Sequence, residues 1–115
     1  MLRLAEQFLI RSEARARQGD LIGAKEDLNK VRKRAGLAES PSLTRDEILA
    51  AVLEERRHEL FTEYGHRFFD LKRNGKLNTA LGNLKAGWND TDEHFPIPEA
   101  EINANPNLKP QNPGY

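Results

Sequence analysis

The stretch from Glu54 to Arg73, EERRHELFTEYGHRFFDLKR, constrains the fold most strongly, because apolar and charged residues share one face of a predicted helix. On a wheel of 100° per residue, one arc of about 120° collects Leu49, Val52, Leu53, Leu60 and Tyr64. Arg56 falls in the middle of this arc. An unpaired buried guanidinium is costly, so we expect Arg56 to be buried with Glu59, Glu63 or a carboxylate just downstream as its partner.

Upstream of this stretch, two amphipathic segments predict an antiparallel pair of helices within residues 1–36. The inner arc of the first, residues 2–17, holds Leu2, Ala5, Phe8, Leu9, Ser12 and Ala16. The second follows Gly19-Asp20, whose aspartate can cap it, and stops at Gly36. Its apolar stripe consists of Leu21, Ala24, Leu28, Val31 and Ala35. The pair has the size of one tetratricopeptide-type hairpin. It lacks the Trp and Pro residues that mark that repeat, and the sequence contains no second copy of the hairpin. One such unit cannot bury its own apolar face, so we expect it to stack on another element or to self-associate.

Residues 44–75 are predicted to be helical. Thr44-Arg-Asp-Glu47 has the spacing of a capping box, and a long helix follows it to about Tyr64. Gly65 ends or kinks this helix, and a short helix is expected over residues 66–72.

Residues 76–115 form a loop-rich segment. A short helix is predicted around Leu77, Leu81 and Leu84. Phe95-Pro-Ile-Pro98 must be extended, because each proline excludes the helical region for the residue before it. The proline-rich end is either a free tail or a strap lying on the domain. The predicted fold is therefore all-α: a tetratricopeptide-like helical hairpin, then a long helix, short helices and a proline-rich extended C-terminal tail.

Composition excludes several classes of function. The chain of 115 residues carries 18 basic and 18 acidic residues, so no net charge draws it to nucleic acid or to an anionic membrane. The absence of cysteine excludes a disulfide scaffold, a thiolate zinc site and a lipid-modified cysteine within this sequence. No apolar run approaches the roughly 20 residues of a membrane span, and residues 1–10 lack a signal-peptide pattern. We therefore expect a soluble chain with no nucleic-acid partner.

Candidate metal ligands are few. His58-Glu59 begins like the zinc motif HExxH, but Thr62 occupies the position of the second histidine. His66 and Asp70 could supply two ligands; without a third, a hydrogen-bonded structural pair is the favoured interpretation. We predict no metal site.

A row of carboxylates, Glu55, Glu59 and Glu63, suggests the paired carboxylates of a glycosidase. Side chains on one helix do not face each other across a bound sugar, and Arg56 and Arg57 lie beside the row to neutralise it. We therefore predict no catalytic residue and no cofactor.

Trp88 lies in a polar loop of Gly, Asn and Asp residues. An aromatic ring in such a loop can serve as a platform on which a sugar stacks. The favoured alternative is that its ring folds back onto the core. Trp88 is thus a weak ligand-binding candidate.

Two groups of residues form a recognisable pattern. The first consists of Glu55-Arg56-Arg57-His58-Glu59-Leu60, Glu63-Tyr64-Gly65-His66-Arg67 and Asp70-Leu71-Lys72-Arg73-Asn74-Gly75. The second consists of His94-Phe95-Pro-Ile-Pro98, Asn105-Pro106 and Gln111-Asn112-Pro-Gly-Tyr115. In this order and spacing they resemble the signature and the C-terminal ending of the SusD/RagB family, and residues 8–29 are similar to the helical pair that precedes that signature. Tyr64 departs from the residue usual in the family.

The resemblance implies a function. SusD/RagB proteins are non-catalytic lipoproteins on the outward face of the outer membrane, anchored by an N-terminal lipidated cysteine. They bind oligosaccharides or other nutrients and work with a TonB-dependent transporter of the SusC type. This chain would be the C-terminal portion of such a protein, with Met1 as an internal start. The alternative is a freestanding tetratricopeptide-like adaptor that binds a peptide or protein partner.

The resemblance also implies a structural role for the charged residues of the central stretch. They would form an ion-pair network that locks the C-terminal helices together. Its members would be Arg56, Glu59, Glu63, Arg67 and Asp70. No ligand-binding residue carries over from the family to this sequence.

Overall fold

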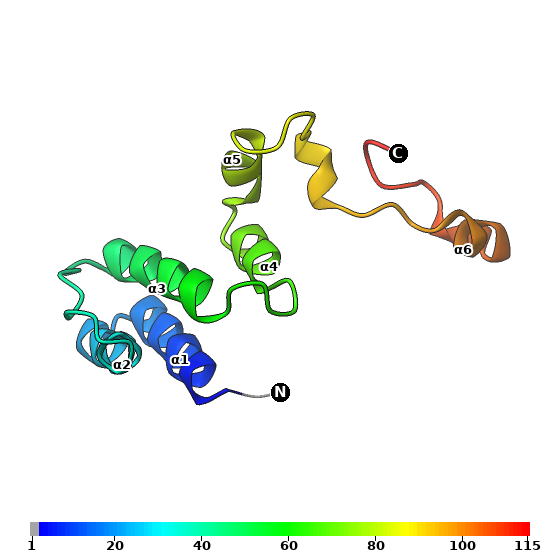
Figure 1. Cartoon of the computed structure of the whole chain (residues 1–115). Helices are drawn as coiled ribbons and strands as arrows, with labels where there is room; N and C mark the ends of the chain where they lie inside the picture. Colours follow the sequence, from blue (N-terminus) through cyan, green and yellow to red (C-terminus); the bar gives the residue numbers. More distant parts are fainter. Residues whose placement is uncertain (1–2) are drawn as a thin grey trace. The chain divides into compact units, whose positions relative to one another are not determined.

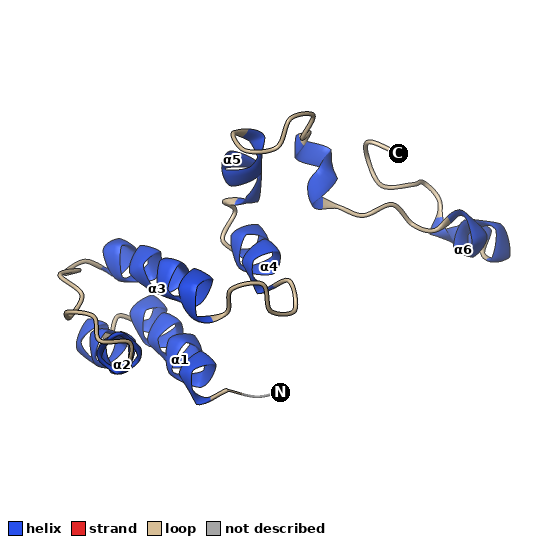
Figure 2. Cartoon of the chain, in the orientation of Figure 1, coloured by secondary structure: helices blue, strands red, loops and turns tan. Residues whose placement is uncertain are grey.

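The computed structural model describes residues 3–115, and within them the chain forms α-helices, short 3-10 helices and turns but no strand (Figure 1 and Figure 2). This confirms the predicted all-α fold. The chain divides into two compact units, residues 1–67 and residues 68–115, and each is described by itself. Leu2, predicted to belong to the first helix, lies outside the described residues.

The first unit begins with the predicted helical hairpin, α1 (Leu4–Gln18) and α2 (Leu21–Arg34). Gly19 reverses the chain with φ of 90°, a left-handed conformation that glycine adopts without steric cost. The Asp20 side chain then accepts a hydrogen bond from the Gly23 N–H at 2.9 Å and caps α2. Both predicted signals are confirmed, and the two helices pack against each other.

Helix α3 (Arg45–Glu59) packs on both helices of the hairpin and closes the core. It begins with the predicted capping box, in which Thr44 and Glu47 each accept hydrogen bonds from the other's backbone N–H. The buried core consists of Ala5, Leu9, Ala16, Ala24, Leu28, Val31, Ile48 and Val52. A fully buried aliphatic side chain in such a core contributes roughly 1.5–3 kcal/mol. Thus α3 covers the apolar face that the hairpin could not bury alone.

The predicted stop of the second helix at Gly36 is confirmed: α2 ends at Arg34, Ala35 is its C-cap, and the chain leaves the helix through Gly36 with φ of 75°. Two related predictions are wrong. Ala35 is exposed rather than part of the buried stripe. Helix α3 ends at Glu59, five residues before the expected end. Thr62 and Tyr64 have φ of 60° and 46°, which a right-handed helix cannot accommodate, so Tyr64 turns out of the buried arc and is 75% exposed.

Helix α4 (His66–Arg73) carries the chain into the second unit, which contains α5 (Leu77–Gly82), η1 (Asp90–Glu93), α6 (Glu99–Ala104) and η2 (Pro106–Leu108). Leu71 and Leu77 are buried. Leu84, expected on the same face as Leu77, is 83% exposed because α5 has already ended at Gly82. Residues 95–98 belong to no helix and no strand.

The C-terminal end is not a free tail but a strap that folds back on residues 91–97 of its own segment. The Gln111 side chain accepts a hydrogen bond from the Ile97 N–H at 2.7 Å and donates one to the Ile97 carbonyl at 2.8 Å. The Asn112 amide donates to the carbonyl of Phe95 at 2.7 Å. Gly114 lies against Thr91, where a Cβ would approach the Thr91 Oγ1 to 2.5 Å. The side chains of Gln111 and Asn112 therefore provide hydrogen-bond partners for backbone groups of residues 95–97, which belong to no strand.

Candidate functional site

Arg56 occupies the buried position on α3 that the helical wheel predicts. It is 5% exposed, and Val52 and Leu60 on the same arc are 1% and 2% exposed. The burial of a guanidinium among aliphatic side chains is therefore confirmed. The arc ends at Leu60, since the chain turns away before Tyr64.

The carboxylates beside Arg56 are bound by arginines from other parts of the unit. Glu59 accepts hydrogen bonds from Arg3 at 2.7 Å and from Arg34 at 2.6 Å, and Glu63 accepts one from Arg3. Glu55 accepts one from Arg32 at 3.0 Å. These pairs connect the residue before α1, the end of α2 and the end of α3. They form an electrostatic clamp at one end of the three-helix unit.

The electrostatics of Glu59 reflect two opposing effects. Burial raises the pKa of this carboxyl, but the hydrogen bonds and charges of Arg34 and Arg3 outweigh it and hold the pKa below its ordinary value. Glu59 is therefore ionised at neutral pH and serves as the point where two arginines meet. A carboxylate held in this way is not free to act as a general acid.

The other two members of the predicted network are described in their own units. Arg67 is half-buried at the end of the first unit, and Asp70 is 4% exposed in the second, where Arg73 donates to it at 2.9 Å. That the five predicted residues act together as one network stays a prediction. His66 Nε2 lies 3.6 Å from Glu6 Oε1 on α1.

The sequence analysis missed the most deeply buried charge of the first unit, Asp27. Its carboxylate is fully buried and accepts two hydrogen bonds of 2.7 Å from Arg11 and one of 2.9 Å from Arg15. The hydrogen bonds of Arg11 lower the pKa of Asp27 and outweigh the effect of burial, which raises it. A signal existed: Asp27 lies three residues after Ala24 and four before Val31, within the apolar stripe of α2.

Trp88 is half-buried, and both its indole N–H and its ring contact neighbouring side chains. Its Nε1 donates a hydrogen bond of 2.9 Å to Asn78 Oδ1, and the Lys85 ammonium lies 5.6 Å from the ring centroid. A cation at that distance is attracted by the ring electrons. Trp88 is therefore anchored in its loop, with a lysine over its ring.

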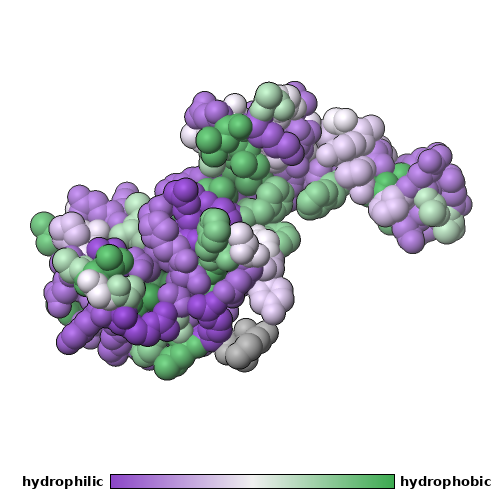
Figure 3. Space-filling model, viewed as in Figure 1, coloured by the Kyte–Doolittle hydropathy of each residue, from purple (hydrophilic) through white to green (hydrophobic). Residues whose placement is uncertain are grey.

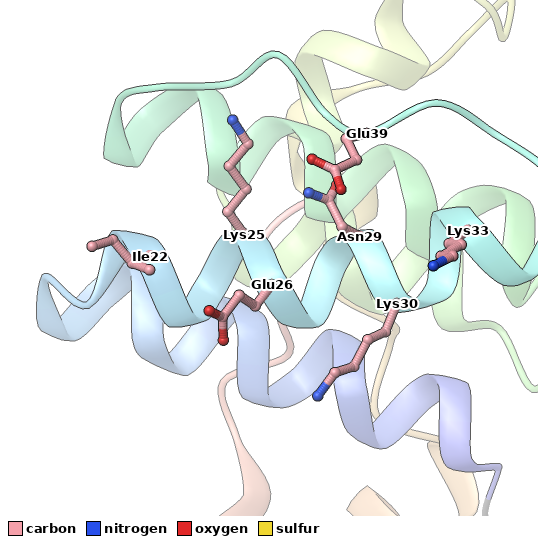
Figure 4. Close-up of a pocket in the computed structure, with 7 residues that line it drawn as sticks. All are labelled: Ile22, Lys25, Glu26, Asn29, Lys30, Lys33 and Glu39. Carbon is pink, nitrogen blue, oxygen red and sulfur yellow. The ribbon is translucent and has the colours of Figure 1, made fainter.

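Several open cavities indent the surface of the first unit. One of about 430 Å³ runs along α2 and is lined by Ile22, Lys25, Glu26, Asn29, Lys30, Lys33 and Glu39. Figure 4 shows Ile22, Lys25, Glu26 and Lys30 pointing away from one another. A ligand site requires polar groups that converge, so this cavity is a poor candidate.

A second cavity, of about 420 Å³, lies at the turn between α3 and α4 and is lined by Arg3, Thr62, Glu63 and Tyr64. It combines an exposed aromatic ring with a guanidinium, a carboxylate and a hydroxyl.

Over helices α1–α3, Figure 3 shows a largely hydrophilic surface interrupted by separate hydrophobic groups. Among residues 3–115, no group of three or more His, Asp or Glu side chains is placed to hold a metal ion.

The sequence matches the SusD family over residues 1–115. The starch-binding protein SusD of Bacteroides thetaiotaomicron is 37% identical over 124 residues, an alignment that covers 100% of this chain and 21% of that protein. SusD-like protein P2 of Formosa agariphila is 33% identical over 136 residues, covering 99% of this chain and 25% of that protein. The chain therefore spans about a fifth to a quarter of the length of the curated relatives that it matches. No solved structure matches it significantly. None of the described helices is long and apolar enough to cross a membrane.

Proposed function

Because this chain belongs to the SusD family, we propose that it is the C-terminal portion of a glycan-binding protein of the outer-membrane surface. The observation that carries the proposal is the match over all 115 residues, together with 37% identity to a relative named for starch binding. In the whole protein, this portion would stabilise the fold while the protein delivers glycans to a TonB-dependent transporter. The protein would be held at the membrane by a lipid anchor outside this sequence.

The ion pairs of the first unit support a structural rather than a catalytic role for the carboxylates of α3 and of the turn that follows it. Each carboxylate of the row Glu55, Glu59 and Glu63 accepts a hydrogen bond from an arginine of a different helix or from Arg3. A general acid must hold a proton, and a general base must be free to accept one. Carboxylates that already accept hydrogen bonds from guanidinium groups are engaged in fixing helices, and for Glu59 these arginines also hold the pKa below its ordinary value.

The alternative, a freestanding adaptor that binds peptides through a tetratricopeptide-type groove, would account for the α1–α2 hairpin alone. The family match continues through residues 76–115, where the chain forms short helices and the C-terminal strap. A helical adaptor does not need this segment. The family-based function is therefore the better supported of the two.

The proposal is tested in the cells that produce the protein. Cells with the gene intact and cells with it deleted are incubated with fluorescent amylopectin and with a panel of other glycans, and the glycan retained at the surface is measured. We expect deletion to abolish retention of at least one glycan. Equal retention of every glycan by both strains would refute the glycan-binding function.

The transporter partnership has its own test. An affinity-tagged protein is isolated from detergent-solubilised outer membranes, and the proteins that accompany it are identified by mass spectrometry. We expect a TonB-dependent transporter in amounts comparable to the tagged protein. Its absence would refute the partnership and leave the glycan-binding proposal standing.

A further inference from the structure

The turn from Leu60 to Gly65 presents two aromatic rings to solvent on an unusual backbone. Phe61 is 71% exposed and Tyr64 is 75% exposed. Thr62 and Tyr64 both have positive φ, a conformation that is unfavourable for residues other than glycine and especially for β-branched threonine. Such backbone conformations persist where the surrounding contacts enforce them, and they are enriched at ligand-binding sites.

Three kinds of contact involve this turn and the residues that flank it. Arg3 donates hydrogen bonds to Glu63 on the turn and to Glu59 at the end of α3. Within the turn, the His66 N–H donates to the Glu63 carbonyl at 2.9 Å. The Tyr64 ring meets the His66 ring edge to face, with centroids 6.3 Å apart. These contacts fix Glu63, the residue just before Tyr64, and a turn whose backbone is already held loses less entropy when a ligand binds.

The cavity beside this ring has the chemistry that a sugar requires. At about 420 Å³ its volume falls within the range of roughly 300–1,000 Å³ common for small-ligand sites. A pyranose has an apolar face of C–H groups, which stacks on an aromatic ring, and a rim of hydroxyls, which need donors and acceptors. Tyr64 supplies the ring, Arg3 the donors and Thr62 a hydroxyl. Glu63 Oε1 is bound to Arg3, and among the described residues no donor binds its Oε2.

The charges around the cavity balance. The carboxylates of Glu59 and Glu63 meet the guanidinium groups of Arg3 and Arg34. A balanced cluster offers no net attraction to an acidic sugar, because each cation is already neutralised by a carboxylate. The site therefore favours an uncharged ligand.

We propose that Arg3, Thr62, Glu63 and Tyr64 form a subsite for an uncharged pyranose unit of a glycan, with Tyr64 as the stacking platform. This inference rests on the proposed glycan-binding function and adds to it a position and a class of ligand. It differs from the hypothesis about Trp88, where the Lys85 ammonium lies over the ring. It also differs from the α2 cavity, which is lined by no aromatic residue.

The test uses the purified 115-residue chain and isothermal titration calorimetry with maltoheptaose, and with an oligogalacturonide as the acidic comparison. We expect measurable binding of maltoheptaose and weaker or no binding of the acidic sugar. Tyr64→Ala should raise the Kd for maltoheptaose by about threefold to tenfold, the range for losing one aromatic stacking contact, while Tyr64→Phe should retain affinity because the ring remains. Phe61→Ala is the matched control: Phe61 is as exposed as Tyr64, but it does not line the cavity.

Each outcome decides the question. Loss of affinity in Tyr64→Ala, with retention in Phe61→Ala and an unchanged melting temperature in both, supports the subsite. Unchanged affinity in Tyr64→Ala, or loss in Trp88→Ala instead, overturns it. Absence of binding by the unsubstituted chain to maltoheptaose also overturns it, while the cell-surface assay judges the proposed function separately. If analytical ultracentrifugation shows that Tyr64→Ala dissociates a dimer and leaves sugar affinity unchanged, the turn is a self-association surface and the subsite is refuted.

Discussion

The replacement Asp27→Asn tests the ion pair between α1 and α2, because it removes a fully buried charge and keeps the side chain's shape. Asparagine presents an amide group where Arg11 and Arg15 now donate three hydrogen bonds of 2.7–2.9 Å to a carboxylate. Breaking a buried ion pair by removing one partner costs roughly 3–5 kcal/mol. The Arg11 and Arg15 side chains are 51% and 34% exposed, so their released charges return partly to water. We therefore expect the lower end of that range, about 3 kcal/mol.

The assay is urea-induced unfolding followed by far-ultraviolet circular dichroism, with a thermal melt as a second measurement. A loss of about 3 kcal/mol lowers Tm by roughly 10–20 °C in a chain of this size. Asp46→Asn is the matched control, since Asp46 is 82% exposed and pairs with its neighbour Arg45 on the surface. We expect a loss below about 1 kcal/mol in the control, because an exposed ion pair and an exposed charge in the first turn of a helix each contribute little.

The pH dependence of the effect provides a sharper test. The folded-state pKa of Asp27 is depressed by the hydrogen bonds of Arg11 despite its burial. A carboxyl of this kind stabilises the fold above its unfolded-state pKa of about 3.9 and loses that contribution as pH falls through its folded pKa. The stability difference between the original chain and Asp27→Asn should therefore shrink as the solution is acidified. A difference below about 1 kcal/mol at neutral pH, or one that does not shrink in acid, would refute the reasoning.

Three further substitutions test other parts of the chain. Arg56→Ala should lower the free energy of unfolding by more than about 3 kcal/mol, because Arg56 is 5% exposed and a buried guanidinium is kept with its partner; an unchanged Tm would contradict its structural role. Thr44→Ala should cost about 1 kcal/mol in urea unfolding through loss of the helix cap, and Thr79→Ala, at an exposed site in α5, serves as its comparison. Gln111→Ala should accelerate amide hydrogen exchange at Ile97, and equal exchange rates in the two proteins would mean that the strap is held by other contacts.

Sequence reasoning predicted the elements whose determinants are local. The capping box of Thr44 and Glu47, the cap at Asp20 and the left-handed glycines at residues 19 and 36 all depend on atoms within a few residues of one another. The burial of Arg56 followed from helical periodicity in the same way. The early end of α3 did not, because Thr62 and Tyr64 adopt a backbone conformation that neither residue type favours.

The helical periodicity of the sequence could not predict the candidate sugar subsite, for the same reason. Tyr64 was placed on the buried arc by extending a helix that ends at Glu59. Its exposure follows from the turn, and the turn is held by Arg3, which lies 60 residues before Glu63 in the chain. No local pattern contains that contact.

The amino-acid sequence alone determined the helical class of the chain, most helix starts and the family to which it belongs, since propensity, caps and motifs are properties of short stretches. The choice of ion-pair partners came from the tertiary structure: Arg3 and Arg34 approach Glu59 across 56 and 25 residues, and Arg11 and Arg15 enclose Asp27 between two helices. Any arginine can pair with any carboxylate, so the order of charged residues in the sequence is compatible with many different ion pairs. Packing of α1, α2 and α3 around their shared core selects among them, because it fixes which charged groups come within hydrogen-bond distance.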